Sequence, residues 1–110
     1  MNASKNLERR KLKSWAEVAS RLVAVATGKE AADLVIQECE LVNVQPRVIL
    51  SGWQVAVTEG RFAYVGPDAS HCIGPATQRV DGGGRYLIPG LCDGHMHIES
   101  GMLIPAEFAA

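Results

Sequence analysis

Short runs of branched and aromatic residues, separated by clusters of turn-forming residues, dominate the middle of the sequence. Glycine, proline, asparagine and aspartate in such clusters favour turns, and apolar runs of this length between them predict strands. We predict strands at residues 34–37, 41–44, 48–50, 55–58 and 62–65. They indicate a meander of small antiparallel strands, with its clearest hairpin across Glu59 and Gly60. A loop at 67–78, a strand at 79–81, a turn and a strand at 86–88 would complete a small β-sandwich or half-barrel over residues 29–88.

A helix is expected before this region, at residues 14–28. Ser14 can cap its first turn, and Glu17 stands three residues later, as a capping box requires. Gly28 supplies a stop at the other end. Apolar residues recur between them at three- and four-residue spacing, which is typical of a helix with one buried face: Trp15, Val18, Ala19, Leu22, Val23 and Ala26. The polar and basic residues 1–13 show no such pattern and predict a disordered arm.

Length and charge exclude several classes of protein. The chain has 110 residues and a formal net charge of −1, whereas a (β/α)₈ barrel takes ~250 residues. The balanced charge gives no sustained field for nucleic acid or an anionic membrane, and no apolar run approaches the ~20 residues of a membrane helix. Three widely spaced cysteines without a Cys-x-x-Cys pair favour neither a disulfide framework nor a zinc knuckle. We therefore expect a cytoplasmic protein that acts on a small molecule.

A row of polar residues follows an apolar run late in the sequence. Residues 89–100 read Pro-Gly-Leu-Cys-Asp-Gly-His-Met-His-Ile-Glu-Ser. In a strand, Asp93, His95, His97 and Glu99 would share one face, and the two imidazoles, ~6.6 Å apart along the strand, could lean together onto one divalent ion. Histidine pairs also occur by chance on exposed strands. Burying such polar side chains next to a core-like run costs free energy, however, unless they have partners. A bound metal ion offsets that cost.

Two other features could suggest a binding site but indicate only a structural role. Gly82-Gly83-Gly84 lacks the Lys-Ser/Thr of a P-loop and the spaced glycines of a dinucleotide fingerprint, so it predicts a tight turn. His71 lies in the predicted loop without ligand-like neighbours in the sequence. We expect it at the surface.

The pattern Pro-Gly-hydrophobic-x-Asp-x-His-x-His at residues 89–97, placed after a small β-domain, resembles the opening of the amidohydrolase superfamily of metal-dependent hydrolases. Its continuation, His97-Ile98-Glu99-Ser100 followed by Met102, is similar to bacterial adenine deaminases, and the resemblance covers about the whole chain after the arm. The fold it implies is mixed α and β, with an N-terminal helix and a small β-sandwich domain. Residues 89–110 would be the first strand and the start of the first helix of a truncated metal-dependent (β/α)₈ barrel.

The resemblance implies an N-terminal fragment of an enzyme that converts adenine and water into hypoxanthine and ammonia. His95 and His97 would be ligands of a divalent metal, Mn²⁺ or Fe²⁺, with Zn²⁺ as an alternative. Asp93 would orient a histidine or pair with a basic residue, and Glu99 would line the site or cap the following turn. The implied partner is adenine as a purine substrate, with no nucleic acid and no membrane, and a homo-oligomer is one option.

Three interpretations stay open from the sequence. The chain is part of an adenine deaminase, or part of another amidohydrolase such as a dihydroorotase-like or imidazolonepropionase-like enzyme, or a non-catalytic remnant β-domain. The family takes its further metal ligands and a proton-shuttling aspartate from later strands, which have no counterpart in these 110 residues. We therefore expect the chain alone to be inactive.

Overall fold

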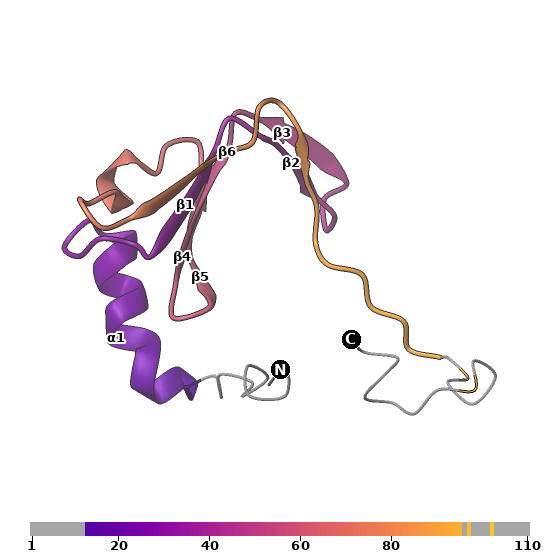
Figure 1. Cartoon of the computed structure of the whole chain (residues 1–110), viewed down its shortest axis with the longest axis horizontal. Helices are drawn as coiled ribbons and strands as arrows, with labels where there is room; N and C mark the ends of the chain where they lie inside the picture. Colours follow the sequence, from indigo (N-terminus) through magenta and orange to yellow (C-terminus); the bar gives the residue numbers. More distant parts are fainter. Residues whose placement is uncertain (1–12, 96, 98–101, 103–110) are drawn as a thin grey trace, which may run out of the picture.

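A computed structural model of the chain describes residues 13–95, 97 and 102 (Figure 1). It is a mixed α and β structure with one α-helix, as the sequence predicts, and two small sheets. The expected arm at residues 1–13 lies outside the described residues except for Lys13. The elements are, in chain order, α1 (Trp15–Ala26), β1 (Leu34–Gln37), β2 (Glu40–Asn43), β3 (Val48–Ser51), β4 (Gln54–Thr58), β5 (Arg61–Gly66), the 3₁₀ turn η2 (Ser70–Cys72), β6 (Gln78–Asp81) and β7 (Tyr86–Leu87).

Helix α1 begins at the capping box that the sequence predicts. The Ser14 backbone N–H donates to the Glu17 carboxylate at 2.6 Å, and the Glu17 N–H donates to the Ser14 hydroxyl at 3.4 Å. Hydrogen bonding of the Glu17 carboxylate with Ser14, foremost with its side chain and then with its backbone N–H, lowers the pKa of Glu17. At the other end Gly28 has a φ of +75°, the left-handed conformation that commonly stops a helix. None of the helices among the described residues has the length and hydrophobicity of a membrane span.

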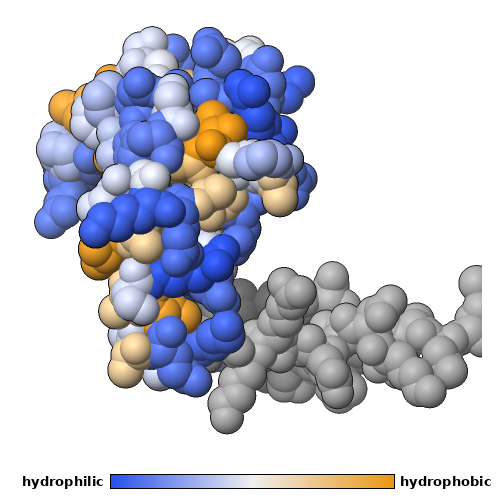
Figure 2. All heavy atoms as spheres, turned by 90° about the vertical axis from the view of Figure 1, so that its left-hand side faces the viewer, coloured by the Kyte–Doolittle hydropathy of each residue, from blue (hydrophilic) through white to orange (hydrophobic). Residues whose placement is uncertain are grey.

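The larger sheet has the strand order β5-β4-β1-β6, and α1 packs against β4 and β5. Strand β4 pairs antiparallel with both β1 and β5, whereas β6 joins β1 in parallel. The core lies between this sheet, α1 and η2, and it consists of Val25, Ala32, Val35, Ala56, Ala69 and Cys72. Figure 2 views the side that lies on the left in Figure 1, where α1 is, and shows mostly hydrophilic side chains over it.

The smaller sheet has the order β3-β2-β7, and it differs from the expected meander. β2 pairs antiparallel with β3 and parallel with β7. The chain therefore passes from the larger sheet to the smaller one at β2, returns to the larger one at β4, and enters the smaller one again at β7. In every strand pair with extensive contact, both strands belong to the same sheet. The two sheets are therefore joined end to end with a bend between them (Figure 1), and are not packed face to face as in the expected β-sandwich.

The bend is held by backbone hydrogen bonds across the triple glycine. Gly82 N–H donates to the Gln37 carbonyl and Gly84 N–H to the Glu38 carbonyl, both at 2.8 Å. Glu38 has a φ of 52° and Gly84 has a φ of 75°. The two chain segments, which are hydrogen-bonded to each other at these residues, therefore both bend there. The Asp81 carboxylate also accepts the Gly83 N–H at 2.7 Å. The triple glycine is thus a tight turn, as the sequence predicts.

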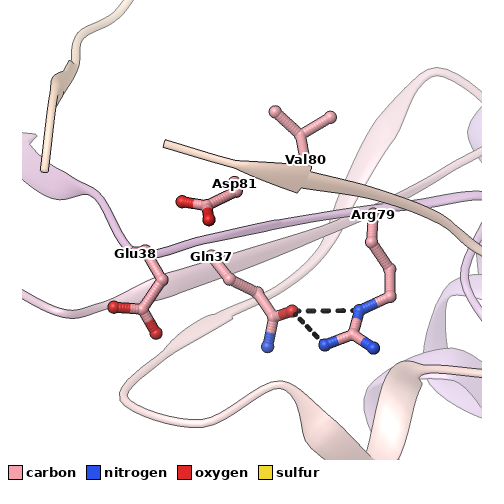
Figure 3. A pocket seen from close by; sticks show the side chains of 5 residues that line it. All are labelled: Gln37, Glu38, Arg79, Val80 and Asp81. Atoms are coloured by element: carbon pink, nitrogen blue, oxygen red, sulfur yellow. Dashed lines mark hydrogen bonds between the residues drawn. The ribbon is translucent and has the colours of Figure 1, made fainter. Parts of the chain in front are cut away.

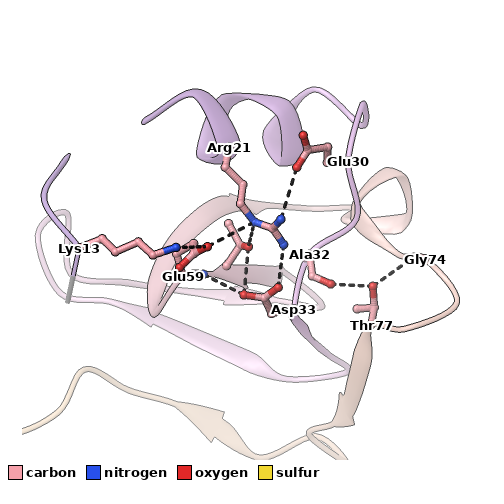
Figure 4. Close-up of polar contacts among 9 residues, drawn as sticks. Lys13, Arg21, Glu30, Ala32, Asp33, Glu59, Gly74 and Thr77 are labelled. Carbon is pink, nitrogen blue, oxygen red and sulfur yellow. Dashed lines mark hydrogen bonds and ion pairs between the residues drawn. The ribbon is translucent and has the colours of Figure 1, made fainter. Parts of the chain in front are cut away.

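A charged network ties α1 to the larger sheet (Figure 4). Thr58 is fully buried; its hydroxyl donates to the Asp33 carboxylate and accepts from Arg21 Nε, both at 3.1 Å. The Glu59 backbone N–H donates to Asp33 at 2.8 Å, and Arg21 Nη2 donates to it at 2.9 Å. The Glu59 N–H is the foremost cause that holds the pKa of Asp33 below its ordinary value, and Thr58 and Arg21 act in the same direction.

Asp33 should therefore make folding sensitive to acid. A carboxyl whose pKa is lowered by folding contributes stability above its unfolded pKa, ~3.9 for Asp, and loses it as the pH falls through the folded value. Urea unfolding of the wild type and of Asp33→Asn is expected to show the variant less stable at about pH 7, with the difference shrinking towards about pH 3. A difference that stays as large in acid as at neutral pH would contradict this role.

Candidate metal centre

The predicted metal ligands lie in the segment that follows β7. Residues 88–95 and 97 are exposed and have no strand assigned, although the sequence pattern predicts a strand from residue 89. A strand needs a neighbour to pair its backbone N–H and C=O groups. None of the described strands pairs with this segment, which runs away from the two sheets (Figure 1). The first barrel strand is thus not seen among the described residues.

The structure nevertheless brings the two histidines together. Nε2 of His95 lies 3.1 Å from Nε2 of His97, with the ring centroids 5.0 Å apart and the rings inclined at 71°. Two nitrogen ligands at ~2.0–2.1 Å from one ion, seen from it at roughly 100°, are about 3.1 Å apart. This contact is a hydrogen bond between the two rings, and the same separation would also suit two nitrogen ligands of one metal ion.

Asp93 acts on the backbone next to this pair. Its Oδ1 accepts a hydrogen bond from the His95 N–H at 3.0 Å, which closes a turn across Gly94. Aspartate commonly makes such a turn with the N–H two residues on. The carboxylate thus fixes the backbone that carries the first histidine, a contact that the strand interpretation of this segment did not predict. Glu99, the fourth predicted site residue, lies outside the described residues.

The donor set fits a divalent ion but is incomplete in the part that the structure describes. Neutral imidazole is a ligand for zinc and iron, and catalytic zinc sites use three protein ligands and one open position. Within residues 13–95, 97 and 102, no cluster of three or more His, Cys, Asp or Glu side chains could hold a metal. These residues therefore offer two nitrogen ligands to a site that needs more.

The third histidine, His71, is exposed, as the sequence predicts. Its Nε2 lies 3.0 Å from the Ala26 carbonyl oxygen at the end of α1, and its ring meets Tyr64 edge-on at 4.7 Å between centroids. A Cβ on Gly28 would lie 3.2 Å from the His71 carbonyl oxygen. His71 therefore packs against the end of the helix and serves the fold.

A hollow of about 310 Å³ at one end of the larger sheet was not predicted (Figure 3). It is lined by Gln37, Glu38, Arg79, Val80 and Asp81. The Arg79 guanidinium donates to Gln37 Oε1 from Nε at 3.2 Å and from Nη2 at 3.0 Å. No local signal marks these residues, because the parallel pairing of β1 with β6 brings them together.

Comparison with known proteins gives relatives for most of the chain. No family model matches it. The adenine deaminase of Ruegeria pomeroyi is 64% identical over 97 residues, which cover 88% of this chain and 16% of that protein. Adenine deaminase 1 of Jannaschia sp. is 66% identical over 95 residues, with 86% and 16% covered. The adenine deaminase of Paracoccus denitrificans is 54% identical over 105 residues, with 96% and 18% covered.

Among solved structures, the crystal structure of BT9727_2919 from Bacillus thuringiensis is similar to the chain. It aligns with a TM-score of 0.47 and 26% identity, covering 61% of this chain and 90% of that one. The relatives in sequence confirm the resemblance predicted from the residues around His95 and His97. The chain is homologous to adenine deaminases over nearly nine-tenths of its length, and it spans about 16% of theirs.

Proposed function

We propose that this chain contributes the first two metal ligands of an adenine deaminase. The observation that carries the proposal is the 3.1 Å separation of His95 Nε2 and His97 Nε2, in a chain homologous to adenine deaminases. The reaction is hydrolysis of a C–N bond, in which adenine and water give hypoxanthine and ammonia. We propose that the metal ion is Mn²⁺ or Fe²⁺, with Zn²⁺ as the alternative, and that the enzyme is cytoplasmic.

The residues of this segment bind and position. A bound divalent ion lowers the pKa of water towards ~7 and so provides a hydroxide nucleophile at neutral pH. His95 and His97 would hold that ion through Nε2, and the turn that Asp93 makes with the His95 N–H fixes the backbone that carries His95. We assign Glu99 the lining of the site.

We propose that further polypeptide supplies the rest of the site. Leu91 and Met102, on either side of the histidines, are 96% and 95% exposed, so nothing among the described residues excludes water from the pair. Apolar side chains in such positions pack against neighbours in a complete protein. We propose that residues 89–110 form the first strand and the start of the first helix of a (β/α)₈ barrel, whose other strands pair with this segment and supply the missing ligands.

A chimera tests this function. The segment of the Ruegeria pomeroyi adenine deaminase that matches this chain is replaced by the chain, and ammonia release from adenine is measured with Mn²⁺ supplied. The chimera is expected to keep kcat/KM within about tenfold of the parent enzyme, because the segments are 64% identical. The 110-residue chain by itself is expected to release no measurable ammonia, since its described residues hold two of about three necessary ligands.

Two results would contradict the proposal. One is a folded chimera that binds Mn²⁺ as the parent does but has no activity. The other is rapid ammonia release from adenine by the 110-residue chain, which would mean that the site is already complete within it.

A further inference from the structure

Two Asp-Gly dipeptides occur in the sequence, Asp81-Gly82 and Asp93-Gly94. In such a dipeptide the backbone nitrogen of the glycine can attack the carboxyl carbon of the aspartate, because glycine has no Cβ to obstruct the approach. Both aspartates form the same local turn, in which the carboxylate accepts the N–H two residues on, at 2.7 Å for Asp81 and at 3.0 Å for Asp93. The two dipeptides therefore differ mainly in what surrounds the glycine.

Gly82 is held by its hydrogen bond and by its neighbours. Its N–H donates to the Gln37 carbonyl at 2.8 Å, in the bend that joins the two sheets. An added Cβ would lie 2.8 Å from the Glu38 carbonyl oxygen, so this glycine packs closely against the neighbouring backbone. Asp81 belongs to β6, and the pairing of β6 with β1 fixes its backbone. The Gly82 nitrogen therefore cannot turn towards the Asp81 carboxyl carbon unless its hydrogen bond breaks.

Gly94 has none of these restraints within the part of the chain that the structure describes. None of the described residues accepts its N–H, and only its chain neighbours lie within 4 Å of the Cβ that a side chain would add. Asp93 and Gly94 are exposed, in a segment with which no described strand pairs (Figure 1). The hydrogen bond from the His95 N–H holds the Asp93 carboxyl group beside the backbone that follows it. The Gly94 nitrogen is therefore able to turn, and the group that it would attack is held next to it.

We propose that Asp93 is a site of spontaneous isomerisation to isoaspartate, through a cyclic succinimide formed with Gly94. The Gly94 nitrogen forms a bond to Cγ of Asp93, and one carboxyl oxygen leaves as water, with the amide proton and one proton from solvent. Water then opens the ring at either carbonyl carbon and returns a proton to the nitrogen. Opening at Cγ restores the aspartate, whereas opening at the main-chain carbonyl carbon leaves an isoaspartate, whose main chain runs through Cβ and Cγ.

The isomerisation changes the backbone beside the first proposed metal ligand. It lengthens the main chain by one carbon, and the turn that Asp93 makes with the His95 N–H cannot form in the same way. We expect the isoaspartate form to bind a divalent ion more weakly. This consequence rests on the proposed function, whereas the modification itself depends only on the backbone around residues 93 and 94.

Prolonged incubation of the 110-residue chain in neutral buffer tests the modification. Peptide mapping combined with isoaspartate-specific enzymatic methylation follows both Asp-Gly dipeptides in one sample. Asp93 is expected to convert at least about tenfold faster than Asp81, since breaking the Gly82 hydrogen bond accounts for about that factor. Gly94→Ala, which the open space around residue 94 accommodates, should slow the reaction at Asp93 by at least about tenfold, because its Cβ obstructs the nitrogen.

The same incubation in urea, with unfolding checked by circular dichroism, is the matched control. Unfolding breaks the Gly82 hydrogen bond, so the two dipeptides should then convert at rates within about threefold of each other. Equal rates in the folded chain would overturn the proposal. So would a difference that persists in urea, because it would come from the local sequence and not from the fold.

Titration of the separated isoaspartate and aspartate forms with Zn²⁺ tests the consequence. The isoaspartate form is expected to bind at least about tenfold more weakly, as loss of a group that supports a metal ligand commonly does. Equal affinity of the two forms would overturn the expected effect on the site. An aspartate form that does not bind Zn²⁺ would contradict the proposed function instead, whatever the rate of isomerisation at Asp93.

Discussion

Replacing either His95 or His97 with alanine is expected to lower kcat/KM of the chimeric adenine deaminase by at least about 100-fold. Loss of a group that merely supports a metal ligand already costs ~10–100-fold in affinity or activity, and removing the ligand itself costs no less. The two Nε2 atoms lie 3.1 Å apart, and in the proposed site both would hold the same ion. The measurement is ammonia release from adenine, together with the metal content of each purified variant.

Two matched variants separate this effect from a general loss of structure. His71→Ala removes the remaining histidine of the chain, which contacts the end of α1, and it should leave both metal content and turnover nearly unchanged. Asp93→Asn keeps an oxygen that can accept the His95 N–H, whereas Asp93→Ala does not. Activity that falls with Asp93→Ala but returns with Asp93→Asn would assign Asp93 the turn that positions His95. Equal activity of the His97→Ala and wild-type chimeras would contradict the proposed ligand.

Gly82→Ala is expected to be the most destabilising small substitution in the bend between the two sheets. A Cβ at residue 82 would lie 2.8 Å from both the Cys39 Cβ and the Glu38 carbonyl oxygen, and the latter is backbone that cannot move aside cheaply. Overpacking of this kind costs about 1–3 kcal/mol. For a domain of this size, that lowers the thermal midpoint by roughly 10 °C.

Gly90→Ala provides the control for that substitution. No other atom lies within 4 Å of the Cβ that it would add, so its thermal midpoint should stay within about 2 °C of the wild type. Equal midpoints for Gly82→Ala and Gly90→Ala would show that the bend has room for a side chain. The close approach of residue 82 to Cys39 and Glu38 would then not be what stabilises the bend between the two sheets.

Local features of the sequence predicted local structure well. Ser14 and Glu17 form the capping box, and β1 spans the predicted residues 34–37. The arrangement of strands needed more, because turn signals say where a strand stops but not which strand its successor joins. Leu34 pairs with Gln78, which follows the loop after β5, and this parallel pairing has no local signature. The contact of Thr58 with Asp33 and Arg21 joins three distant segments and was missed for the same reason.

The sequence named candidate residues for the site but not their backbone conformation. The spacing of His95 and His97 predicts that both are metal ligands, and the structure places their Nε2 atoms 3.1 Å apart. The alternation of a strand, however, is not what brings them together among the described residues, because the segment lacks the neighbouring strands that would hold it extended. The carboxylate of Asp93 binds the nearest backbone N–H instead.

The most direct test of the metal centre follows the ring nitrogens of the three histidines by NMR during titration of the chain with Zn²⁺. The account predicts that the Nε2 signals of His95 and His97 shift together, with one midpoint and one equivalent of metal, while that of His71 stays in place. A shift of only one of the pair, or of His71 alongside them, would contradict the claim that two imidazoles share one ion.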